Sequence, residues 1–103
     1  MNLFLDDTRI QPRSADWQST DDYYEFIGLI NKYVDCLETV DLDYNIGDDS
    51  LYNGYHVLKY MKDHSIRCTH INVHSTHETG RDLMLNYAKS NFTDIKVTGD
   101  PWP

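Results

Sequence analysis

The hydrophobic residues of the chain form short apolar runs that alternate with longer stretches of helical spacing. A short apolar run that ends at turn residues or acids predicts a buried strand, whereas apolar residues three and four positions apart predict an amphipathic helix. Strands that alternate with helices are typical of βαβ units and a parallel sheet. The pattern therefore predicts an α/β fold.

Five strands and three helices are expected. The strands are expected at residues 3–5, 16–18, 39–43, 71–75 and 95–97. The first helix follows capping and acidic residues at 19–22 and is expected to turn inward Phe26, Ile27, Ile30 and Val34. The second is expected to bury Val57, Leu58 and Met61, and the third, capped within residues 79–82, to bury Leu83, Tyr87 and Ala88. Right-handed crossovers then give a doubly wound, mostly parallel five-stranded sheet, which binds ligands at the strand C-termini.

Three aspartates fall where predicted strands end. Asp6 and Asp7 follow the first strand, and Asp43 ends the third. Carboxylates brought together in this way repel one another unless a cation neutralises them, and Mg²⁺ or Mn²⁺ prefers such hard oxygen ligands. The three acids are therefore predicted to hold a divalent metal. Asp41, which alternates with an apolar neighbour, is expected to be a hydrogen-bonded structural acid, with a further metal ligand as the alternative.

Candidate phosphate-binding and catalytic residues surround this edge. Ser75 ends the fourth strand and is expected to bond a phosphoryl oxygen, while His74 is a candidate general acid or base, or else a buried core imidazole. Arg81, at the start of the third helix, and Arg9, in the first loop, are candidate phosphate contacts because a guanidinium binds phosphate as a fork. His77 is expected to be solvated.

Composition narrows the classes of partner. The 103 residues suit one domain, predicted to span residues 1–103, and carry a formal net charge of -8. So few basic residues argue against a long duplex nucleic acid as partner and favour a cation or a small phosphorylated ligand. No run of residues is apolar enough to cross a membrane, and the N-terminus does not resemble a signal peptide. With two cysteines expected to be free and buried, a cytoplasmic location is expected.

The acidic pair, the strand-three Asp and the strand-four Ser resemble the layout of response-regulator receiver domains. A closer resemblance is to the receiver-like family described as cyclic-phosphate processing. The matching motifs are Leu5-Asp6-Asp7 with Arg9 and Pro12, Leu42-Asp43 with Gly47-Asp48-Asp49, Gly54-Tyr55-x-Val57-Leu58, and Val73-His74-Ser75 with Gly80-Arg81. This resemblance implies a flavodoxin-like fold of the receiver type and metal-assisted handling of a cyclic phosphate, in a nucleotide or at an RNA end.

The chain departs from these families at three places. Ordinary receivers keep a Lys before a Pro at the end of strand five, where this chain has Asp100-Pro101. The cyclic-phosphate family tends to show His-Asp after the strand-three Asp, where this chain has Tyr44-Asn45. It also tends to show Asn two positions after His-Ser, where this chain has His77.

Three functional hypotheses follow. In the leading one, a metal-dependent phosphoesterase acts on a cyclic phosphate, with metal on the three acids, phosphate on Arg9, Ser75 and Arg81, and proton transfer by His74. In the second, the domain binds or sequesters a nucleotide without hydrolysis. In the third, an acidic inhibitor occupies the basic surface of a partner protein. The sequence leaves the oligomeric state open.

Overall fold

A computed structural model describes residues 1–6, 16–45 and 52–100. Its five strands form one parallel sheet in the order β2-β1-β3-β4-β5. The strands are β1 (Asn2–Leu5), β2 (Trp17–Thr20), β3 (Thr39–Leu42), β4 (His70–Val73) and β5 (Lys96–Thr98). The predicted α/β fold of the flavodoxin-like receiver type is thus confirmed, with strand bounds shifted by one or two residues.

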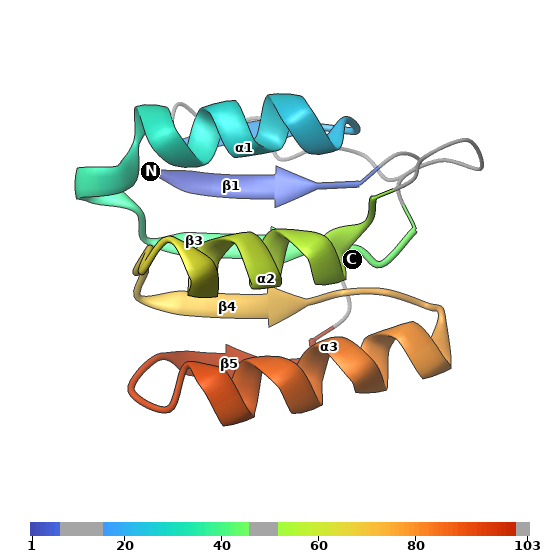
Figure 1. Cartoon of the computed structure of the whole chain (residues 1–103). Coiled ribbons are helices and arrows are strands. Elements are labelled where there is room, and N and C mark those ends of the chain that lie inside the picture. The colour runs from blue at the N-terminus through green and yellow to red at the C-terminus, as the bar shows by residue number, and fades with distance from the viewer. Residues whose placement is uncertain (7–15, 46–51, 101–103) are drawn as a thin grey trace.

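Three helices lie on one side of this sheet (Figure 1). They are α1 (Tyr23–Lys32), α2 (Gly54–Asp63) and α3 (Glu78–Asn91), and a short 3₁₀ helix, η1 (Val34–Cys36), follows α1. Each helix leads from one strand to another that lies nearer the β5 edge of the sheet. Because the three connections move in the same direction, right-handed crossovers put all three helices on the same face. The strand order reverses at β1. The crevice at which such sheets bind ligands therefore lies between the ends of β1 and β3.

Alternate strand residues build the core against the helices. Fully buried leucines, valines and an isoleucine point to this face: Leu3, Leu5, Val40, Leu42, Ile71 and Val73. The intervening residues Phe4, Asp41 and Asn72 are neighbours across three strands and are also buried, with exposures of 0%, 2% and 6%. Asp41 and Asn72 therefore lie on the opposite face of the sheet, and because they are buried and polar, they need hydrogen-bond partners there.

Two residues predicted to face inward are exposed. Leu83 is 43% exposed, and α3 instead buries Gly80, Met84 and Ala88 at four-residue spacing. Packing decides this face, because Gly80 lies against the Tyr44 ring and the Met84 side chain approaches Gly54. The helix also begins at Glu78, capped by His77, and not within residues 79–82 as predicted. Val34 is likewise 43% exposed, because α1 ends at Lys32 and its spacing does not continue into η1. The predicted cap of α1 is confirmed at Asp22, which accepts the N–H of Glu25 at 2.8 Å.

Neither cysteine among the described residues forms a disulfide. Cys36 is exposed, so the expected burial was wrong for it, whereas Cys68 is half-buried and its burial raises the pKa of the thiol to about 11. Within the same part of the chain, no helix has the length and apolar character needed to cross a membrane.

Neighbouring residues of α3 test the observed helix phase. We expect Met84→Ala, which empties a fully buried position, to lower the free energy of unfolding by about 2–5 kcal/mol. Leu83→Ala, the matched control, is expected to change it by less than about 1 kcal/mol. Urea unfolding followed by circular dichroism measures both, and a larger loss for Leu83→Ala would contradict the observed phase.

Candidate functional site

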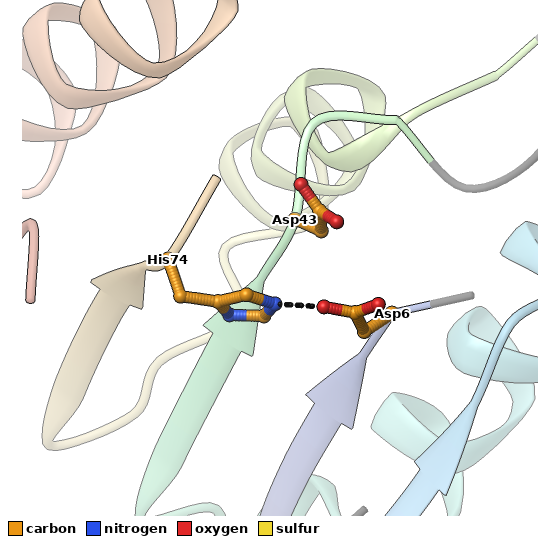
Figure 2. A group of neighbouring side chains, drawn as sticks. All are labelled: Asp6, Asp43 and His74. Carbon is orange, nitrogen blue, oxygen red and sulfur yellow. Dashed lines mark hydrogen bonds and ion pairs between the residues drawn. The ribbon is translucent and has the colours of Figure 1, made fainter. Parts of the chain in front are cut away.

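Three strand ends converge on one cluster of side chains. Asp6, Asp43 and His74 directly follow β1, β3 and β4. The ladder hydrogen bonds continue one residue further, since the N–H of Asp43 donates to the Leu5 carbonyl and that of His74 to the Leu42 carbonyl, both at 3.0 Å. One potential ligand atom from each side chain of the cluster lies within 4.8 Å of the other two (Figure 2). Two of the three predicted metal ligands are thus brought together, and His74 joins them.

His74 is held between two carboxylates. Its Nε2 lies 2.7 Å from Asp6 Oδ2, and its Nδ1 lies 2.5 Å from Asp41 Oδ1. The ring is 1% exposed and stacks on Phe4, with 4.8 Å between the ring centroids. A carboxylate can only accept, so both ring nitrogens donate when both carboxyls are ionised. His74 is then an imidazolium in a buried ion-paired triad.

The charges of the cluster shift two pKa values upward. Burial alone lowers the pKa of His74, but the hydrogen bond and charge of Asp41, the hydrogen bond to Asp6 and the charge of Asp43 outweigh it and raise the pKa above the ordinary 6.5. The pKa of Asp43 is raised chiefly by burial and further by the charge of Asp6, although hydrogen bonds from the Ser75 hydroxyl and the Tyr44 N–H oppose the shift. The carboxylates thus determine the shift of His74, whereas burial is the main cause of the shift of Asp43.

A polar row fixes Asp41 from the other side. The Asn72 amide donates to Asp41 Oδ1 at 3.1 Å, and its oxygen accepts from the Thr98 hydroxyl at 2.6 Å and from the Asp100 N–H at 3.0 Å. These contacts favour the structural reading of Asp41. Asn72 was not among the predicted site residues, although a polar residue between the apolar Ile71 and Val73 is the same signal that pointed to Asp41.

A cleft beside the cluster brings two candidate phosphate ligands together. It has a volume of about 380 Å³ and is lined by His74, Ser75, Thr76, Glu78, Arg81 and Gly99. Among the described residues, the Arg81 guanidinium donates to the Gly99 carbonyl, at 3.3 Å, with one of its five N–H groups. The volume is in the range of small-molecule sites. Of the other predicted site residues, Asp7 and Arg9 lie outside the described residues.

Glycine lets α2 approach the cluster closely. A Cβ at Gly54 would lie 2.1 Å from the carbonyl oxygen of Asp43, so no larger residue fits without moving the strand end. The backbone N–H of Gly54 also donates to the Tyr44 carbonyl at 3.3 Å. The first turn of α2 therefore fixes the backbone that carries Asp43.

The donor atoms of the cluster could hold a divalent cation. Two carboxylates and one imidazole offer oxygen and nitrogen ligands, and Asp41 holds the second ring nitrogen of His74. A carboxylate bonded to the far nitrogen of a histidine is the usual outer partner of a metal ligand. A cation would also replace the imidazolium proton as the charge that balances the aspartates.

The metal-free protein provides a test through the pH dependence of His74. Because the carboxylates stabilise the protonated ring, its native pKa exceeds the unfolded one; this stabilisation is complete below about pH 6.5 and is lost as the pH rises through the native pKa. NMR titration of the ring in the presence of a chelator should give a midpoint above 6.5, and Asp41→Asn should lower it. A wild-type midpoint at or below 6.5 would contradict the described triad.

Comparison with known protein families agrees with the motifs. A family model described as the cyclic-phosphate processing receiver domain matches residues 1–90. This range contains four of the five strands and all three residues of the cation cluster. No curated protein and no solved structure matches the sequence. Because the family model covers most of the chain, the resemblance is confirmed, and the chain belongs to the family of cyclic-phosphate processing receiver domains.

Proposed function

We propose that this domain is a divalent-metal-dependent phosphoesterase that opens a cyclic phosphate by hydrolysis. The observation that carries the proposal is the convergence of Asp6, Asp43 and His74 within 4.8 Å, beside the cleft that contains Ser75 and Arg81. A cation cluster next to a serine and an arginine supplies what phosphoryl chemistry requires, namely charge neutralisation and positioning. Membership of a family associated with cyclic-phosphate processing supports the same reaction.

The metal ligands in this proposal are Asp6, Asp43 and His74. His74 would bind through Nε2, without its proton, while Nδ1–H would continue to donate to Asp41. The two carboxylates suit Mg²⁺ or Mn²⁺, whereas the imidazole is a ligand more usual for transition metals than for Mg²⁺. The bound ion would polarise the phosphoryl group and lower the pKa of a bound water.

Arg81 would orient the phosphate, and Ser75 would add a hydrogen bond once its hydroxyl turns from Asp43 to a phosphoryl oxygen. Both line the cleft beside His74, with Arg81 in the first turns of α3, where the helix dipole also favours an anion. In the reaction a water oxygen bonds to phosphorus as one P–O ester bond of the ring breaks. One water proton passes to the leaving oxygen, and the product is a phosphomonoester with a free hydroxyl group. The guanidinium neutralises the charge that develops on the phosphoryl oxygens.

The burial of His74 bears on its role. His74 is 1% exposed and both of its ring nitrogens contact carboxylates. It is therefore better placed to bind a metal than to act as the general acid or base that the sequence predicted. The same observation favours a second candidate function, in which the domain binds the cyclic phosphate and does not cleave it. The tests below separate the two.

Metal binding can be tested without a substrate. Calorimetric titration of the chelator-treated protein with Mn²⁺ should show one site, and Asp43→Asn should weaken it about tenfold or more. The raised pKa of Asp43 means that its ionised form costs stability in the metal-free protein, so the variant should be at least as stable as wild type. Equal Mn²⁺ affinity in the variant would contradict the assigned ligands.

Hydrolysis can be tested on 2′,3′- and 3′,5′-cyclic nucleotides with Mn²⁺ or Mg²⁺, followed by chromatography. We expect metal-dependent release of a phosphomonoester, a loss of about 100-fold or more in kcat/KM for Arg81→Ala, and a smaller loss for Arg81→Lys, which keeps the charge without the fork. A bound but intact nucleotide would select the binding function. Neither binding nor cleavage would exclude both.

A further inference from the structure

Two aromatic rings lie nearly parallel beside the cation cluster. The centroids of Tyr44 and His77 are 4.9 Å apart, with 22° between the ring planes. A Cβ at Gly80 would lie 2.3 Å from the Tyr44 ring, so the ring packs directly on the backbone of α3, where only glycine fits. Tyr44 is half-buried, whereas His77 is exposed. The pair thus offers an aromatic surface to the solvent.

Hydrogen bonds fix this pair to the residues of the proposed site. The N–H of Tyr44 donates to Asp43 Oδ1 at 2.7 Å, and the N–H of His77 donates to the Ser75 hydroxyl oxygen at 3.1 Å. His77 Nδ1 accepts the N–H of Gly80 at 2.9 Å, so a neutral ring carries its proton on Nε2. Tyr44 is therefore hydrogen-bonded to a proposed metal ligand, and His77 to a proposed phosphate ligand. The surface is held in one orientation before any ligand binds.

We infer that Tyr44 and His77 form a stacking site for a nucleobase, and that the substrate is a nucleoside cyclic phosphate. The inference rests on the proposed function, because the pair can serve as a base site only if the neighbouring residues bind the phosphate of the same ligand. Bases stack on aromatic side chains whatever their sequence, and Nε2–H of His77 can donate to an acceptor on the base edge. A rigid surface next to the phosphate site lowers the entropic cost of holding the nucleoside.

The charge of the chain favours a mononucleotide over a nucleic-acid chain. One phosphate can be neutralised by a cation and Arg81, whereas a longer backbone would meet a formal net charge of -8. A short RNA that ends in a cyclic phosphate is therefore expected to bind no more tightly than the mononucleotide. Tighter binding of the RNA at physiological salt would overturn this assignment.

The test compares two ligands that differ only in the base. With Mn²⁺ present, adenosine 2′,3′-cyclic phosphate is compared with methyl riboside 2′,3′-cyclic phosphate, which lacks the base, by calorimetry or, where the ligand is hydrolysed, by kcat/KM. Wild type should prefer the nucleotide by about 5- to 150-fold. His77→Asn should abolish most of this preference and leave the affinity for the base-free ligand unchanged. Tyr44→Leu should reduce the preference in the same way.

Paired variants separate stacking from helix capping. His77→Asn keeps a good N-cap but removes the ring, so its melting temperature should match wild type. His77→Phe keeps a ring but loses the cap acceptor and the Nε2–H donor, so it should keep the part of the preference that stacking provides and melt about 4–8 °C lower. Tyr24→Ala removes a tyrosine that is 67% exposed at the start of α1. This control should change neither the preference for the nucleotide nor the melting temperature.

The outcomes distinguish this inference from the proposed function. Equal binding or hydrolysis of both ligands by wild type would leave the phosphoesterase standing and overturn the base site. A preference that survives in both His77→Asn and Tyr44→Leu would also overturn it. Failure of both ligands to bind would reject the proposed function, and the base site with it.

Discussion

The contact of His74 with carboxylates on both sides is the constraint on which the other features depend. Asp6 follows β1, Asp41 lies in β3 and His74 follows β4, so one imidazole joins three strands at the edge where the strand order reverses. All three side chains are almost fully buried. Removing one member of such a group leaves an unpaired buried charge, which costs far more than an exposed ion pair contributes. The fold and the electrostatics of the site are therefore coupled.

The surroundings of the triad determine what it can bind. Asn72 fixes Asp41 and, through the backbone of Asp100, also fixes the end of β5. Asp43 adds a further carboxylate whose raised pKa reflects its burial and the charge of Asp6. The protonated ring balances part of this charge in the absence of a metal, and a divalent cation would balance more of it. A site organised in this way is suited to bind a metal and an anionic ligand together.

Several features could be predicted from the sequence because they depend on local pattern. Apolar runs located the strands, and the acids that end them located Asp6 and Asp43, since parallel strands bring their C-terminal ends to one edge. The alternation of Asp41 with Leu42 predicted a paired structural acid. Other features depend on phase or on contacts between distant residues. Leu83 was misplaced because the packing of α3 against Tyr44 and Gly54 decides which of its residues face the core. The partners of His74 and the contact of Tyr44 with His77 depend on side-chain directions that no spacing along the chain encodes.

The central claim is that Asp6, Asp43 and His74 form one cation site. An anomalous-scattering map from a crystal grown with Mn²⁺ tests it most directly, because the ion itself is located. The account predicts a single strong peak within coordination distance of a carboxylate oxygen of each aspartate and of Nε2 of His74, with Nδ1 of His74 still hydrogen-bonded to Asp41. A peak elsewhere, or an Mn²⁺-saturated protein in which His74 still contacts Asp6 and no ion lies between them, would contradict the account.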